Sequence, residues 1–142
     1  MGDNMKERDF QSEFGKRNKV AGVFELKFCK GTSLPFKSVA DHQIKALKDA
    51  STDGLYHKIS DSPFFKDPAG KMRFTKPKPF DCFYLKNIHA YVVIMWWIPR
   101  KKKNVYYIPI ARWVGMQSGF NRKSVTETMA EQYSAFTSSY LK

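Results

Sequence analysis

Two charged residues, Glu25 and Lys27, stand two positions apart in the otherwise mostly apolar segment 22–29. Side chains alternate along a β-strand, so these two would share one face and the apolar residues between them the other. Charged residues inside a sheet are usually paired, bind a metal or take part in chemistry. The pair is therefore the first candidate for a functional site.

Asp81 is a second acid in an apolar setting, within the segment "PFDCF" (79–83). Hydrolysis of a phosphodiester needs a cation to neutralise the transition state and an activated water in line with the leaving oxygen. Mg²⁺ prefers hard oxygen ligands and usually takes one or two carboxylates from the protein. Glu25, Lys27 and Asp81 supply two acids and a lysine, which fits this chemistry.

The charge balance indicates an anionic partner. The chain of 142 residues has 25 Lys and Arg against 13 Asp and Glu, a formal charge of +12. Such an excess attracts polyanions, with nucleic acid as the first candidate and an anionic membrane surface as the second. The residues expected at phosphates lie on the predicted loops and helix starts: Lys30, Lys37, His42, Lys66, Lys71, Arg73, Lys76, Lys78, Arg100, Lys101, Lys102, Lys103, Arg112, Arg122 and Lys123.

The sequence predicts a cytoplasmic protein without a membrane anchor. The first twenty residues lack the apolar segment of a signal peptide, and the apolar run 90–99 is about half the length that spans a bilayer. Cys29 and Cys82 lack metal-ligand spacing and are expected to be reduced core residues. The small, basic chain would suit a phage or a reduced genome.

Residues 1–142 are expected to form one domain. Phe10 and Phe14 lie four positions apart among charged residues, a spacing that predicts an amphipathic helix over 5–18. A strand over 22–29 is expected to follow it. Ser38, with Asp41 three residues later, marks a helix from about 39 to 50, with Val39, Gln43, Ala46, Leu47 and Ala50 on one face. Residues 51–79 are expected to form an inserted basic hairpin or loop.

The remaining segments predict further strands and a final helix. Segments 79–86 and 90–97 are expected to be adjacent strands joined by a tight turn near 87–89, and the basic turn "PRKKKN" leads into the strand "VYYIPI". The aromatic residues Tyr91, Trp96, Trp97, Tyr106 and Tyr107 are expected mostly in the core, with stacking on unpaired bases as the alternative for any that face outward. Ser124 and Glu127 form a capping box that opens a helix. The order predicts an α/β (α+β) domain with a central sheet.

The segments "FELK" and "SLPFKSVADHQIKAL" together resemble the core of the RecU-type Holliday-junction resolvases, within the PD-(D/E)xK nuclease superfamily. The matching residues are Glu25, Lys27, the segment 34–36 and the pair His42 and Gln43. The resemblance extends over 22–47, and more loosely over 90–110. It implies a restriction-endonuclease-like fold, with a central mixed sheet flanked by helices and, in this chain, an inserted hairpin.

The resemblance also implies a mechanism. Glu25 would hold Mg²⁺, with Mn²⁺ as the alternative, and Lys27 would orient the attacking water. The second metal-binding acid would be Asp81, which is chosen for its own apolar setting and is not implied by the resemblance. Gln43 would support them, and Glu13 on the first helix is the matching candidate for a further metal ligand. The implied protein is a homodimer, because resolving a four-way DNA junction requires two symmetric cuts.

The chain departs from the family pattern in one respect. The family places its metal-binding aspartate on a strand before the E-x-K strand, where this chain has only Asp9, within the predicted helix. We expect an inserted hairpin, with strands near 55–60 and 79–86, to present Asp81 instead, with Asp9 or Glu13 as alternatives. Two other functions stay open: a nucleic-acid-binding module that does not cut, and a restriction or repair nuclease acting on other DNA.

Overall fold

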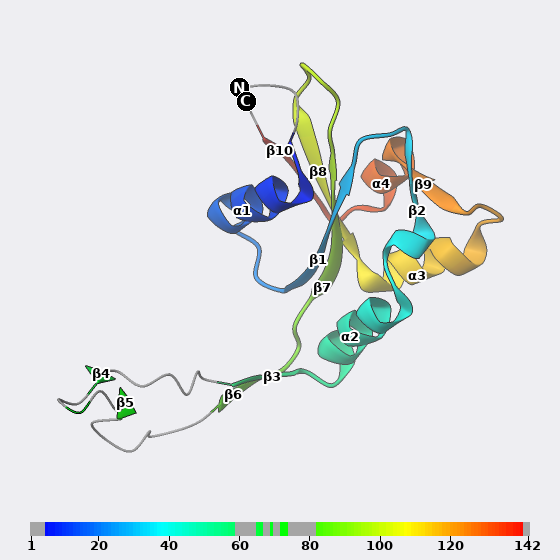
Figure 1. Cartoon of the computed structure of the whole chain (residues 1–142). Coiled ribbons are helices and arrows are strands. Elements are labelled where there is room, and N and C mark those ends of the chain that lie inside the picture. The colour runs from blue at the N-terminus through cyan, green and yellow to red at the C-terminus, as the bar shows by residue number, and fades with distance from the viewer. Residues whose placement is uncertain (1–4, 59–64, 67–68, 70–71, 74–81, 141–142) are drawn as a thin grey trace.

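A four-stranded sheet forms the centre of the protein (Figure 1). The computed structural model describes residues 5–58, 65–66, 69, 72–73 and 82–140. The central strands are β1 (Val23–Cys29), β7 (Ala90–Trp96), β8 (Lys103–Pro109) and β10 (Phe136–Tyr140), in the spatial order β1-β7-β8-β10. β1 and β7 are parallel, and the other two neighbouring pairs are antiparallel. The sheet is therefore mixed, as the sequence predicted.

Helix α2 (Asp41–Thr52) lies in the chain between the parallel strands β1 and β7 and packs on one face of the sheet. Two parallel neighbouring strands need a crossover connection of this kind, because a tight turn reverses the chain direction and can join only antiparallel strands. Helices α3 (Ile110–Gly119) and α4 (Glu127–Tyr133) cover the same face. The core between them includes Val92, Ile94, Trp96, Ile108 and Trp113.

A small antiparallel ribbon completes this face. It pairs β2 (Ser33–Pro35) with β9 (Ser124–Thr126), and a single 3-10 turn, η1 (Phe36–Ser38), leads from β2 toward α2. Leu34, Phe36 and Val125 are buried in the same core cluster. The ribbon thereby ties the segment before α2 to the segment before α4.

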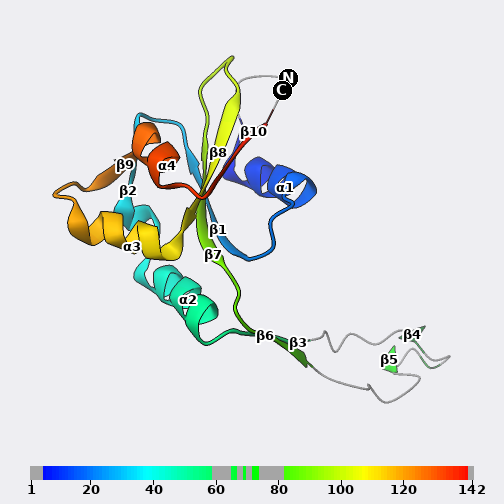
Figure 2. The same ribbon diagram turned by 180° about the vertical axis from the view of Figure 1, so that it is seen from behind.

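Helix α1 (Glu7–Arg17) covers the opposite face of the sheet (Figures 1 and 2). Its buried residues Phe10 and Phe14 pack with Tyr91, Val93, Met95, Val105 and Tyr107, which alternate with the residues of the first core. Phe24, Leu26 and Phe28 of β1 face this second core. The central sheet therefore has helices on both faces.

A second two-stranded ribbon extends away from the central sheet, beyond α2 (Figures 1 and 2). It pairs β3 (Leu55–Lys58) with β6 (Cys82–Leu85), antiparallel, at the positions where the sequence predicted the strands of an inserted hairpin. A further short pair, β4 (Phe65–Lys66) with β5 (Met72–Arg73), lies between them in the chain.

Several local expectations were wrong. β6 and β7 are consecutive in the chain but lie in different sheets, because β7 pairs on both sides within the central sheet. Helix α2 begins after Ala40, not at Ser38, whose hydroxyl donates to the carbonyl of Pro35 in the preceding turn. Helix α4 begins after Thr126, whose Oγ1 accepts from the Met129 amide, and Ser124 belongs to β9.

The expected core was largely found. Tyr91, Trp96, Trp97, Tyr106 and Tyr107 are all buried, as is Cys29. Cys82 was expected in the core but is exposed, because it belongs to the projecting ribbon. Along α2 the buried side chains are Ile44, Leu47 and Ala50, whereas Ala46 is exposed.

None of the helices in the described part of the chain is both long and apolar enough to cross a membrane.

Candidate functional site

Glu25 and Lys27 lie on the face of β1 that α2 covers. The ladder pairs them with Val92 and Ile94 of β7, which belong to the core beneath α2 and α3. Lys27 keeps 15% of its side-chain surface exposed and Glu25 keeps 23%. The pair is therefore half-buried, and it is not an exposed surface pair.

Gln43, from the first turn of α2, joins the two charged side chains. Lys27 Nζ lies 2.9 Å from Glu25 Oε1. Gln43 Nε2 donates to Glu25 Oε1 over 2.8 Å, and Gln43 Oε1 accepts from Lys27 Nζ over 3.4 Å. We call these three residues the β1–α2 cluster. It brings together three of the four predicted catalytic residues, although Gln43 is eighteen positions from Glu25 in the chain.

The start of α2 fixes the orientation of the Gln43 amide. Gln43 Oε1 also accepts from the backbone N–H of Ala40, the N-cap residue, over 2.9 Å. The oxygen thus faces two donors and the nitrogen faces a carboxylate, so the reversed amide would lose all three interactions. A hydrogen bond that the N-cap amide donates to a side chain at the third helical position is also a known way to begin a helix. The residue that starts α2 is therefore the residue that orients Glu25.

The cluster lies at an edge of the sheet. β1 has one neighbour, β7, in the described sheet order. The Val23 N–H donates to the carbonyl of His89 and the Trp97 N–H donates to the carbonyl of Cys29, so the odd-numbered residues of β1 bond toward β7. The backbone groups of Phe24, Leu26 and Phe28 consequently point to the outer edge. That edge of β1 therefore pairs with no strand in the described part of the chain.

The structure does not bring Glu13 to the cluster. Glu13 belongs to α1, which packs on the opposite face of the sheet. Its carboxylate pairs with Arg17 at 2.9 Å and with Lys16 at 3.6 Å, and the hydrogen bond from Arg17 lowers the pKa of Glu13. Asp9, the other alternative, lies on the same helix, where it accepts from the Lys6 amide.

The described residues contain no large group of metal-binding side chains. No group of three or more His, Cys, Asp or Glu side chains among them could hold a metal ion. The β1–α2 cluster contains one carboxylate, that of Glu25. Mg²⁺ takes one or two protein carboxylates and keeps several waters, so Glu25 would supply one ligand of such an ion and leaves room for a second carboxylate. The predicted second ligand, Asp81, lies outside the described residues.

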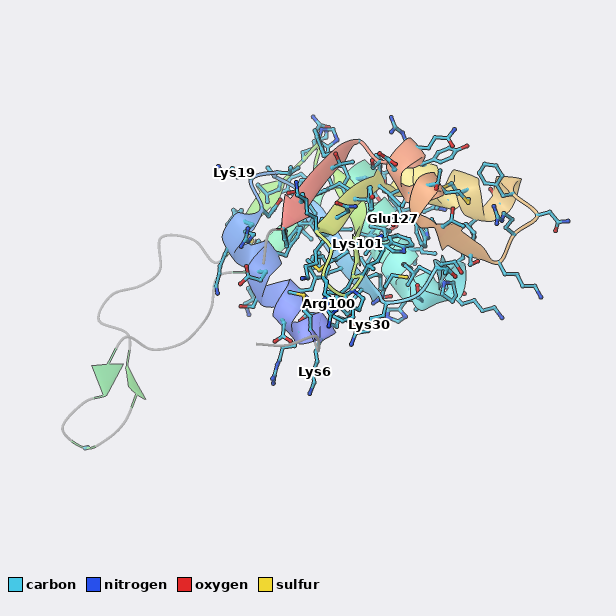
Figure 3. The ribbon with its side chains drawn as sticks, turned by 90° about the horizontal axis from the view of Figure 1, so that it is seen from above. Lys6, Lys19, Lys30, Arg100, Lys101 and Glu127 are labelled. Carbon is cyan, nitrogen blue, oxygen red and sulfur yellow. The ribbon has the colours of Figure 1, made fainter. Side chains whose placement is uncertain are left out.

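Basic side chains gather near the end of the sheet where β1 and β7 finish (Figure 3). Lys30 follows β1, and its Nζ lies 5.6 Å from the ring centre of Phe28 and 5.1 Å from that of Trp97. Arg100 and Lys101 occupy the turn between β7 and β8, and Lys6 caps the start of α1. Lys102 is exposed in that turn and Lys103 is half-buried at the start of β8.

The other predicted phosphate contacts are spread over the surface. Lys37 is exposed in η1 and His42 is exposed in the first turn of α2, next to Gln43. Arg122 and Lys123 are exposed before β9, and Arg122 also contacts the Met129 sulfur at 3.7 Å. Nothing is described of the side chains of Lys66, Lys71, Arg73, Lys76 and Lys78.

Arg112 has a structural partner. Its guanidinium donates to the backbone carbonyls of Tyr133 and Ser134, each over 3.2 Å, at the carboxyl end of α4. Helix carbonyls at that end have no partner within the helix, so an arginine there caps it. Arg112 therefore joins α3 to α4.

Sequence reasoning missed a second group of polar side chains, around Glu127. Glu127 Oε1 accepts from the Tyr106 hydroxyl over 2.8 Å and from the Asn104 amide over 3.1 Å. Burial, with the Glu127 hydrogen bond, raises the pKa of Tyr106. This group joins α4 to β8. Sequence reasoning could not find it, because the group exists only where α4 packs against β8.

Sequence reasoning also missed the exposed aromatic side chains of the ribbon formed by β3 and β6, among them Tyr56, Phe83 and Tyr84. The aromatic residues of "LYHK" and "CFYL" could have signalled them, had the pairing of the two segments been known.

Comparison of the chain with protein-family models, with curated proteins and with solved structures found no match.

Proposed function

We propose that this protein is a metal-dependent DNA endonuclease that hydrolyses phosphodiesters in branched DNA, most simply as a Holliday-junction resolvase. The observation that carries the proposal is the β1–α2 cluster, in which Glu25, Lys27 and Gln43 meet on one half-buried sheet face. The charge of +12 supports an anionic substrate of the size of DNA.

The charges of the cluster favour a cation requirement. The carboxylate of Glu25 and the ammonium of Lys27 neutralise each other at 2.9 Å, so the cluster as a whole does not attract a phosphate strongly. A divalent cation at Glu25 would leave Lys27 with net positive surroundings, to which a phosphate oxygen can bind. In this proposal Mg²⁺ or Mn²⁺ supplies charge neutralisation, and Asp81 provides the second carboxylate.

Each residue of the cluster has a proposed role. Lys27 holds the attacking water or a phosphate oxygen through its ammonium group. Gln43 is a positioning residue: it fixes the Glu25 carboxylate and keeps Lys27 beside it. Exposed basic residues such as Lys30, Arg100 and Lys101 bind the DNA backbone and place a phosphate at the open edge of β1. A homodimer supplies two such sites for the paired cuts.

A labelled four-way junction and a linear duplex of equal length test the proposal. Each is incubated with the protein in Mg²⁺, in Mn²⁺ and in EDTA, and the products are separated under denaturing conditions. The proposal predicts paired nicks in the junction that disappear in EDTA and in Asp81→Ala. Efficient cutting of the linear duplex would identify a nuclease for other DNA. Cutting that persists in EDTA would contradict the metal requirement.

One observation favours a second function, that of a DNA-binding module that does not cut. Among the described residues, Glu25 supplies the only carboxylate of the cluster, and it is already paired with Lys27 and Gln43. A protein of this kind would bind the junction in EDTA as well as in Mg²⁺ and would leave it intact. Tight, salt-sensitive binding without products under either cation would establish this alternative.

A further inference from the structure

The ribbon formed by β3 and β6 carries aromatic side chains that are exposed to solvent. Tyr56 is 73% exposed, Tyr84 44% and Phe83 43%. Large apolar groups left in water cost free energy, and a group of them usually marks a surface that contacts a partner. The ribbon projects beyond α2, away from the central sheet (Figures 1 and 2).

The aromatic side chains form one pair on each face of the ribbon. The register places Tyr56 opposite Tyr84 and His57 opposite Phe83. The Tyr56 and Tyr84 rings lie 4.7 Å apart at 36°, and the His57 and Phe83 rings lie 4.9 Å apart at 37°. Because neighbouring residues of a strand point to opposite faces, the two pairs face away from each other.

The root of the ribbon is held in a defined geometry. Gly54 has φ of +90°, and a Cβ there would lie 2.6 Å from the Leu85 carbonyl oxygen. Asn87, after the second strand, also has a positive φ, 58°. The Tyr84 hydroxyl donates to the carbonyl of Asp53 at the end of α2. These constraints orient the Tyr84 ring while leaving it exposed.

The charges around the rings indicate an anionic partner. The ribbon strands and the residue after them contain Lys58 and Lys86 and no acid. The intervening segment 59–81 has five Lys and Arg against three Asp. Aromatic rings interleaved with cations are the combination that binds single-stranded nucleic acid, with the cations at phosphates and the rings at bases.

We infer that this ribbon binds unpaired DNA bases, by stacking them on the Tyr56–Tyr84 pair and the His57–Phe83 pair. This inference rests on the proposed function for its choice of DNA, and it deepens that function by assigning unpaired nucleotides to the ribbon. Bases within a duplex already stack on their neighbours, so exposed rings reach the faces of unpaired bases only. The stacking is independent of base sequence, because every base has an aromatic face.

The test compares a fluorescein-labelled thymidine oligonucleotide with an abasic oligonucleotide of the same length, by fluorescence anisotropy in EDTA. The two carry the same phosphates, so any difference in affinity comes from the bases. We expect the protein to bind the thymidine oligonucleotide at least about fivefold more tightly. Tyr56→Ala and Phe83→Ala each reduce this preference, whereas Tyr56→Phe and Phe83→Tyr, which keep a ring, retain it.

The salt dependence distinguishes stacking from phosphate binding. Loss of a ring releases no additional counterions, so both alanine variants are expected to keep the slope of log affinity against log salt. Their circular dichroism and thermal unfolding verify that the exposed substitutions leave the fold intact. Equal affinity of the unmodified protein for the two oligonucleotides would overturn the inference.

Three outcomes distinguish this inference from dimer formation through the ribbon and from the two proposed functions of the β1–α2 cluster. If Tyr56→Ala changes the sedimentation coefficient but not the preference for bases, the ribbon contacts a second copy of the chain and the inference is wrong. If the junction is cut but bases are not preferred over abasic sites, the inference fails while the proposed nuclease stands. A base preference without any cutting supports the ribbon and leaves the binding module as the function of the β1–α2 cluster.

Discussion

Gln43 donates from Nε2 to Glu25 Oε1 over 2.8 Å, and this hydrogen bond ties the first turn of α2 to the centre of β1. The same amide accepts from Lys27 and from the Ala40 backbone, so one side chain serves both the helix start and the cluster. The amide and the ammonium offset the desolvation of the half-buried Glu25 carboxylate, so removal of either group should lower the stability of the protein. The cluster is therefore testable through stability as well as through activity.

Lys27→Met is expected to lower the free energy of unfolding by about 1–3 kcal/mol, because Glu25 then stays half-buried with Gln43 as its remaining partner. Urea titration followed by circular dichroism measures this change. The double variant Glu25→Gln, Lys27→Met is expected to recover part of the loss, since it removes the charge left behind. Lys45→Met is the matched control, because Lys45 pairs with Asp49 at an exposed site, where solvent screens the pair and little change in stability is expected. Equal losses of unfolding free energy in Lys27→Met and Lys45→Met would show that Lys27 does not offset the burial of the Glu25 carboxylate.

Thr126→Ala is expected to destabilise the protein by about 1 kcal/mol, because Thr126 Oγ1 caps α4 by accepting from the Met129 amide. Ser124→Ala, which removes the residue that the sequence favoured as the cap, is expected to cost less than about 0.5 kcal/mol. Thermal unfolding of the two variants compares them directly. The reverse order would mean that α4 begins two residues earlier than the structure shows.

The cap of α4 shows where sequence reasoning reached its limit. Both Ser124 and Thr126 are good cap residues, and the pairing of β9 with β2, a long-range contact, decides between them. The strand 23–29, the two strands that follow the ribbon and the meeting of Glu25, Lys27 and Gln43 were predictable. The apolar pattern of each strand and one crossover helix determine them.

Other features depended on which face each element covers. Glu13 was a reasonable ligand candidate until α1 was found on the face opposite Glu25. Helix α3 and strand β10 were not predicted: the apolar run through Pro109 continues from a strand into a helix without a polar break, and β10 carries three small polar residues, Thr137, Ser138 and Ser139. Their structure comes from packing against the sheet rather than from local pattern.

One thiol of the native protein is expected to react with an aromatic disulfide reagent, and both are expected to react in denaturant. Cys82 is exposed, whereas Cys29 is buried and burial raises the pKa of its thiol, so that less of the reactive thiolate forms. Cys82→Ser is expected to abolish rapid labelling of the folded protein. Rapid reaction of the remaining Cys29 would contradict the placement of β1 against the core.

The double variant Arg100→Ala, Lys101→Ala is expected to weaken duplex binding and to reduce the slope of log affinity against log salt by about 1.8, for two lost phosphate contacts. Arg112→Ala is expected to leave this slope unchanged and to lower stability by about 1 kcal/mol, because its guanidinium donates to Tyr133 and Ser134. Fluorescence anisotropy at several salt concentrations gives both slopes. If Arg112→Ala reduces the salt slope and the double variant does not, the DNA interface lies on the α3 side of the molecule instead.

The central claim, that the β1–α2 cluster cuts DNA, is tested most directly by the cleavage rate of Glu25→Gln on a four-way junction in Mg²⁺. Asp49→Asn makes the corresponding carboxylate-to-amide change at an exposed position of α2 and serves as the control. The account predicts a loss of at least about a hundredfold in Glu25→Gln and an unchanged rate in Asp49→Asn, with junction binding retained in both. Cutting by Glu25→Gln at the rate of the unmodified protein would contradict the assignment of this cluster as the catalytic site.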